Sequence, residues 1–117
     1  MSYFQSNRSG PLNTDLFACD SAGEVILMVS SLENPYSKVL SIFLSKLQTS
    51  ELIEILEGRE SEDSFILLEG GVELVVGFTG SNYMFDMYSI EDRVDITATI
   101  TNEELELLLL FLETALC

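Results

Sequence analysis

Histidine is absent from this sequence of 117 residues. Without it the chain lacks the usual general base near neutral pH, the partner that activates serine or cysteine nucleophiles, and the commonest zinc ligand. Glycine-rich phosphate loops are missing as well, because Gly70-Gly71 and Gly77 to Gly80 fall in or between expected strands with no helix after them. We therefore expect no catalytic centre, no cofactor and no metal site, so the protein is not expected to be an enzyme.

Carboxylates are abundant, and they leave two alternatives open. A pair of them acting as general acid and base cannot be dismissed by counting, since 20 Asp and Glu residues are present. Glu91, Asp92 and Asp95 could approach a hard cation, but they lack the alternating oxygen ligands and central glycine of a calcium loop. A polar turn between two strands explains them more simply.

Basic residues are also scarce. Five lysines and arginines stand against 20 acidic residues, which gives a formal net charge of −15 and a pI of about 4.1. The five are scattered and form no basic stripe, so the charge argues against direct binding of nucleic acid. A charge beyond what solubility requires indicates instead a basic protein partner.

The sequence has few cysteines and no long apolar run. Cys19 and Cys117 do not make a disulfide framework, so a reducing compartment is the simpler expectation. No basic-then-apolar stretch opens the chain, and no apolar run approaches the length of a membrane span. We expect a cytoplasmic protein that does not contact a membrane.

Hydrophobic residues make up 47% of the chain, which is ample for one core. Residues 1 to 13 lack periodicity and are expected to be a mobile lead-in, followed by a single α+β domain over residues 14 to 117. Residues 16 to 19 and 25 to 29 predict a hairpin. Asn34-Pro35 is typical of a helix start, and apolar residues from Tyr36 to Leu47 recur at helical spacing.

The second half of the chain predicts a short helix, a meander and a final helix. Residues 50 to 57 fit a helix that ends at Gly58. Four strands between 65 and 100 are joined by short loops, which favours an antiparallel meander. Thr101 to Glu104 form a capping box before a last, leucine-rich helix. The expected fold is α+β, with the order β-β-α-α-β-β-β-β-α and helices on one face of a largely antiparallel sheet of about six strands.

Three surfaces are candidate partner contacts. The first is an acidic stripe, where no basic residue compensates at helical spacing; it consists of Glu51, Glu54, Glu57, Glu60, Glu62 and Asp63. The second is the polar face of the meander, with Glu73, Asp86, Tyr88 and Asp95, unless residues 1 to 13 cover it. The third is Leu107 and Leu110 in the polar arc of the last helix, a candidate oligomer contact.

The chain resembles bacterial immunity proteins of contact-dependent and other polymorphic toxins. The resemblance rests on these features together, and on the meander that leads through Thr101-Asn102-Glu103-Glu104 into the leucine-rich run from Leu105 to Leu110. The resemblance implies a cytoplasmic protein, monomeric or homodimeric, that binds and neutralises a cognate toxin. That toxin would often be a basic nuclease domain, held by charge complementarity. The chain also resembles type III secretion chaperones, which would imply a homodimer holding an effector segment, although their usual first helix is replaced here by an expected hairpin.

Overall fold

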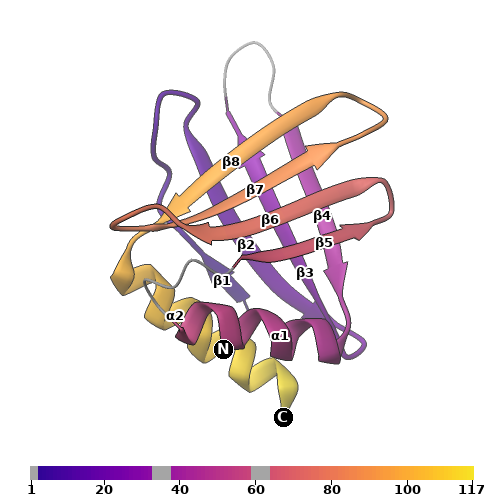
Figure 1. Ribbon diagram of the computed structural model, residues 1–117, viewed down its shortest axis with the longest axis vertical. Helices are drawn as coiled ribbons and strands as arrows, with labels where there is room; N and C mark the ends of the chain where they lie inside the picture. The colour runs from indigo at the N-terminus through magenta and orange to yellow at the C-terminus, as the bar shows by residue number, and fades with distance from the viewer. Residues whose placement is uncertain (1–2, 33–37, 59–63) are drawn as a thin grey trace.

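Two antiparallel sheets of four strands, each followed by one helix, make up the fold in the computed structural model, which describes residues 3 to 32, 38 to 58 and 64 to 117 (Figure 1). The first sheet, sheet A, contains β1 (Tyr3–Gln5), β2 (Thr14–Ser21), β3 (Glu24–Ser31) and β4 (Lys38–Leu44), and α1 (Lys46–Glu57) follows it. The second, sheet B, contains β5 (Phe65–Glu69), β6 (Val72–Phe78), β7 (Tyr83–Ser89) and β8 (Val94–Ile100), and α2 (Asn102–Leu116) follows.

The chain is therefore a tandem repeat of four strands and a helix. Strand order equals chain order in both sheets, and the registers correspond: Val25 pairs with Leu44 in sheet A as Tyr83 pairs with Ile100 in sheet B. These registers assign each position of one repeat an equivalent in the other. A side chain in one sheet can therefore be compared with its structural equivalent in the other.

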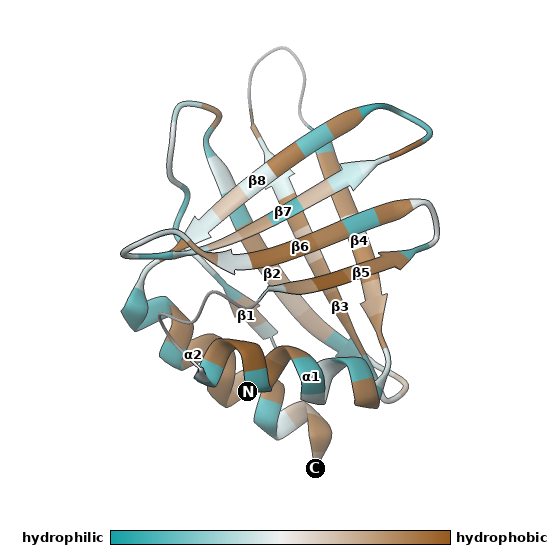
Figure 2. Cartoon of the chain, viewed as in Figure 1, coloured by the Kyte–Doolittle hydropathy of each residue, from teal (hydrophilic) through white to brown (hydrophobic). Residues whose placement is uncertain are grey.

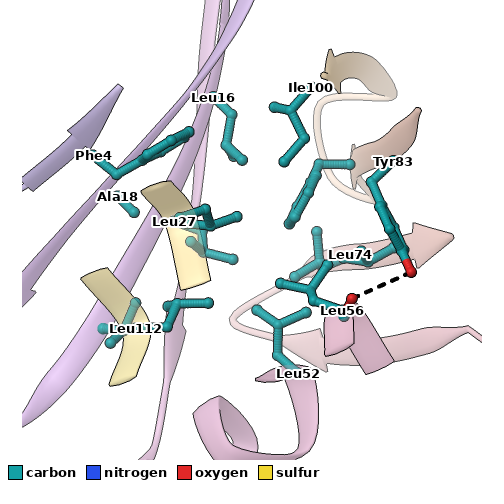
Figure 3. Close-up of a cluster of buried hydrophobic side chains, with 14 of the residues drawn as sticks. Phe4, Leu16, Ala18, Leu27, Leu52, Leu56, Leu74, Tyr83, Ile100 and Leu112 are labelled. Carbon is teal, nitrogen blue, oxygen red and sulfur yellow. Dashed lines mark hydrogen bonds between the residues drawn. The ribbon is translucent and has the colours of Figure 1, made fainter. Parts of the chain in front are cut away.

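The core lies between the two sheets and is closed at one end by both helices. Strands of the two sheets run across one another, and α1 and α2 lie side by side below them (Figure 1). Leu16 and Leu27 of sheet A face Leu74 and Ile100 of sheet B, and all four are fully buried (Figure 3). Leu52 and Leu56 of α1 and Leu112 of α2 complete the cluster.

Both helices begin with the same capping arrangement. The Ser45 side chain accepts a bond from the Gln48 amide at 3.2 Å, and the Gln48 side chain accepts one from the Ser45 amide at 2.8 Å. Thr101 and Glu104 repeat this pattern at α2, as the sequence predicts. These reciprocal bonds satisfy amides that the first turn leaves without partners.

The predicted fold class is wrong. The structure has two sheets of four strands in the order β4-α-β4-α, in place of a six-stranded sheet with the order β-β-α-α-β-β-β-β-α. Part of the error lies at residues 38 to 44, which were expected in a helix and form β4, and part lies at Tyr3–Gln5, which form the unexpected strand β1. The apolar residues of β4 fit both periods, because Leu40, Ile42 and Leu44 alternate inward while the remaining apolar positions recur at helical spacing. The expected helix start at Asn34-Pro35 lies outside the described residues.

The N-terminal segment differs from the expected mobile lead-in. Tyr3–Gln5 pair with β2 as β1, and Phe4 is only 3% exposed. The Asn7 amide donates to Glu104 Oε2 at 2.6 Å, which ties this segment to the start of α2. The Phe65–Ile100 meander and the helix ending at Gly58, in contrast, lie where the sequence predicts them, although α1 begins earlier, at Lys46.

Candidate functional site

The outer face of sheet A, away from the core, is apolar and aromatic although it faces solvent. Tyr3 and Phe17 stack with ring centroids 5.7 Å apart, and Phe43 and Val39 are 49% and 59% exposed. We call this surface the apolar face. Its members, fixed by strand alternation and register, are Tyr3, Phe17, Ile26, Met28, Val39 and Phe43. Flat aromatic side chains on an open sheet can stack against nucleobases or pack against another apolar surface.

One carboxylate lies at the edge of the apolar face, and it is fully paired. Asp15 is 2% exposed and accepts hydrogen bonds from Gln5 Nε2 at 3.0 Å and from the Ser30 hydroxyl. Arg8 lies 3.5 Å from the same carboxylate and also donates to the Asn13 carbonyl at 2.9 Å. Because this network compensates the charge, Asp15 does not make the apolar face anionic.

The outer face of sheet B differs in carrying carboxylates among its apolar residues, of which Ile66 and Leu68 of β5 are 67% and 60% exposed. Register places Glu73, Tyr88 and Asp95 in one row across three strands, and Asp86 beside Thr97 in the next. The Thr97 hydroxyl donates to Asp86 Oδ1 at 2.5 Å. This acidic face contains the predicted residues Glu73, Asp86, Tyr88 and Asp95, so the structure brings them together.

Asp86 raises the pKa of its neighbour Asp95 on the acidic face. A side-chain hydrogen bond with Asp86, then partial desolvation, then the charge of Asp86 raise the pKa of Asp95 from 3.8 to about 6. The loop at Ser9 to Leu12 and the β8 side chains of Asp95, Thr97 and Thr99 line one shallow cleft, so the N-terminal segment borders this face along β8.

Comparison of equivalent positions shows how the two faces diverge. Met28 and Val39 on the apolar face correspond in register to Asp86 and Asp95 on the acidic face. The difference in charge extends from these faces to the whole repeats. Residues 1 to 58 carry three basic and seven acidic residues, whereas residues 59 to 117 carry two basic and thirteen acidic ones. Sheet A therefore presents the surface least repulsive to a polyanion.

The helices carry most of the other predicted contacts. Glu51, Glu54 and Glu57 are exposed on α1, while Glu60, Glu62 and Asp63 lie outside the described residues. Leu107 and Leu110 on α2 are 50% and 54% exposed. A groove between the helices is lined by Glu57 of α1 and by Glu106, Leu109, Leu110 and Glu113 of α2. Glu57 of the α1 stripe and Leu110 of α2 therefore border the same groove.

Sequence reasoning missed the apolar face entirely. Residues 3 to 5 were assigned to a lead-in and residues 39 to 43 to a helix, so the aromatic side chains of β1 and β4 were never placed on one sheet. The signal was present in the alternation of Val39, Ser41 and Phe43 with the buried Ile42 and Leu44.

The fold is one known from proteins that bind guide RNA. A solved guide RNA-binding protein complex bound to a guide RNA superimposes with a TM-score of 0.75 at 18% identity, covering 97% of this chain and 88% of that one. The MRP1/MRP2 structures from Trypanosoma brucei match with a TM-score of 0.72 at 18% identity, covering 97% of this chain and 83% of that chain. At this identity the likeness is one of fold.

Sequence comparison adds no family. No family model matches the chain, and no curated protein matches it.

These structural matches correct five expectations. The resemblance to toxin immunity proteins is wrong, and so are toxin neutralisation by charge complementarity and the secretion-chaperone alternative, because the matching folds belong to guide RNA-binding proteins. The basic nuclease toxin as partner is wrong for the same reason. The exclusion of direct nucleic-acid contact, drawn from net charge alone, is overturned as well. Net charge averages over the two unlike faces, and it also ignores stacking, which needs no cation.

No helix in the described part of the chain is long and apolar enough to cross a membrane.

Proposed function

We propose that the protein is a non-catalytic, RNA-binding subunit that contacts single-stranded RNA through the apolar face of sheet A. The observation that carries the proposal is the fold match over 97% of the chain to proteins that bind guide RNA as a complex. Exposed Tyr3 and Phe43, together with the half-buried Phe17 that stacks on Tyr3, supply aromatic surfaces on that side. Stacking on an aromatic side chain contributes about 1–3 kcal/mol per base and tolerates any base.

The charge of the chain indicates that it works with a second, more basic subunit. Only Arg8, Lys38 and Lys46 belong to the repeat that carries the apolar face, and Arg8 is already bonded to Asp15. Phosphate neutralisation must therefore come mainly from elsewhere. The groove lined by Leu109, Leu110 and three glutamates is the surface that we assign to this subunit. One of these glutamates, Glu57, belongs to the acidic stripe of α1.

A cytoplasmic location remains part of the proposal. Cys19 and Cys117 are both free thiols, which suits a reducing compartment.

The proposal is tested by fluorescence anisotropy with a labelled single-stranded RNA of about 20 nucleotides. We expect weak binding by the chain alone, and a salt dependence no steeper than a slope of about −2, because at most three phosphates can be neutralised by this repeat. Replacing Phe43 with Ala should weaken binding about fivefold to hundredfold. The matched control is Tyr88→Ala on the acidic face, which should leave the affinity unchanged.

Two results would contradict this assignment. One is the absence of any RNA binding at low salt by chain that is folded by circular dichroism. The other is an equal loss in Phe43→Ala and Tyr88→Ala, because the apolar face would then have no special part in binding.

A further inference from the structure

The outer edge of β4 is unpaired. In the described residues β4 is the last strand of sheet A, and its backbone pairs with β3 alone. Such an edge presents a row of free N–H and C=O groups that can accept another strand.

This edge also lacks the usual protection against strand addition. The pairing from Ser31–Lys38 to Val25–Leu44 is continuous, so no bulge bends β4 away. After Lys38 the strand holds no charged residue and no proline. Val39 and Phe43 are instead largely exposed along it. Natural edge strands are normally blunted by at least one of these devices, so an open edge of this kind suits a partner strand.

A cleft of about 380 Å³ runs along the edge, and carboxylates lie on its far side. The β5–β6 and β7–β8 turns project past β4 on one side of the molecule (Figure 1) and line the cleft together with Val39, Ser41 and Phe43. The Ile90 amide donates to the Gly71 carbonyl at 3.0 Å, so the two turns are tied together. They place Glu69, Glu91 and Asp92 around the cleft.

The chemistry of the cleft selects its occupant. Free backbone groups favour an extended peptide, the exposed apolar side chains favour apolar residues at alternate positions, and the carboxylates favour lysine or arginine between them. No basic side chain lines this cleft in the described residues.

We propose that the β4 edge binds an extended basic segment of a partner protein, which adds as a fifth strand to sheet A between β4 and the two turns. This site goes beyond the RNA-binding function, since it takes a peptide and uses the strand edge. Val39 and Phe43 belong to both sites, so the two proposals are separated by variants that lie in only one of them.

The test uses a labelled peptide of alternating lysine and valine, about as long as β4, and a peptide of alternating glutamate and valine as the negative control. We expect the first to bind and the second not to bind. Hydrogen exchange followed by NMR should show slower exchange for alternate amides of Val39 to Phe43 on peptide addition, and no change for β1, which lies at the other edge.

Reversing the charge of residues that line the cleft tests independently whether the peptide binds there. Glu69→Lys combined with Glu91→Lys should weaken binding of the lysine peptide about tenfold or more. The matched control, Glu51→Lys with Glu54→Lys on α1, changes net charge equally and should leave binding within about threefold, because those residues lie away from the cleft. All four glutamates are exposed, so neither variant disturbs the core.

Three outcomes would overturn the proposal: peptide binding without protection of β4, equal losses in the two charge variants, or protection of β4 by an oligouridylate in place of the peptide. The oligouridylate result would assign the edge to RNA. Tyr3 lies at the other edge of sheet A, so Tyr3→Ala should weaken RNA binding and leave peptide binding intact. Unchanged RNA binding in this variant would count only against stacking on the apolar face.

Discussion

Among single residues, Asp15 shows how a charge can be held within a mainly apolar sheet. Its carboxylate is 2% exposed and reaches Gln5, Ser30 and Arg8, which come from β1, β3 and the loop between β1 and β2. The network joins three segments across the outer side of sheet A. It therefore supports the short β1, which brings Tyr3 onto the apolar face.

Replacing Asp15 with Ala should lower the free energy of unfolding by about 1–3 kcal/mol, because Gln5 and Arg8 would lose a buried acceptor. Urea denaturation measures the change. Asp20→Ala, at an exposed position on the same strand, is the control and should stay within about 0.5 kcal/mol of the wild type. Equal stability of the two variants would show that the network contributes nothing.

Asp95 makes the stability of the protein depend on pH, with a sign opposite to the one usual for a carboxylate. Its pKa of about 6 in the folded chain lies above the unfolded value of 3.8, so the folded state binds more protons between these values. The contribution of Asp95 to stability is therefore largest below about pH 4 and is lost as pH rises through about 6. Asp95→Asn should remove this dependence and should raise the melting temperature at pH 7, where repulsion from Asp86 ends.

The measurement is the melting temperature at pH 5 and pH 7 for both proteins. Glu73→Gln on the same face is the control, since it removes one negative charge, as Asp95→Asn does, and leaves the Asp95 carboxyl in place. If Glu73→Gln flattened the pH dependence as much as Asp95→Asn, the effect would come from overall charge.

At the scale of elements, the position where α1 begins decides the fold. Because the helix starts only at Lys46, residues 38 to 44 are left to form β4. The side chain of Ser45 caps the helix directly after Leu44, and Gln48 completes the reciprocal bond. Ser37, Ser41 and Ser45 are poor helix formers within the stretch that the sequence alone assigned to a helix. Apolar periodicity over 39 to 47 outweighed this signal in the prediction.

Ser45→Ala should therefore destabilise the protein by about 1 kcal/mol through loss of the cap. Ser50→Ala, inside the same helix, should stabilise it by a few tenths of a kcal/mol, because alanine has the higher helix propensity. Thermal denaturation distinguishes the two signs. A Ser45→Ala variant as stable as the wild type would show that α1 does not depend on this cap.

The sequence predicted the secondary structure correctly where its apolar residues followed a single period, either that of a strand or that of a helix. The strands of 65 to 100 alternate clearly around short turns, and Thr101 to Glu104 match a capping box, so the second repeat could be predicted nearly to its bounds. The first repeat could not, because β4 fits two periods and β1 has three residues. Among the site residues, the acidic face followed from alternation within one repeat, whereas the apolar face requires β1 and β4 to lie on the same sheet.

At the scale of the whole molecule, the acidic residues are concentrated in one repeat, while both repeats expose apolar residues. The second repeat carries thirteen of the 20 acidic residues, and hydrophobic residues extend along β5 as well as β4 (Figure 2). A molecule with a net charge of −15 repels itself in the compact state. That repulsion is tolerated because the two sheets and both helices share one large core.

Raising the salt concentration from about 0.01 to 0.15 M shortens the screening length from about 30 to about 8 Å, so the melting temperature should rise. The variant with Glu51→Lys and Glu54→Lys has less repulsion to screen and should show a smaller rise. Scanning calorimetry measures both. A melting temperature that falls with salt would mean that attractive charge pairs outweigh the repulsion.

The central claim, that RNA stacks on the apolar face, is tested most directly by photo-crosslinking. A single-stranded RNA with 4-thiouridine would be irradiated with the intact chain, and the crosslinked residues would be identified by mass spectrometry. The account predicts crosslinks at Tyr3, Phe17 and Phe43 of sheet A. Crosslinks at Tyr88 on the acidic face without any on sheet A would contradict it.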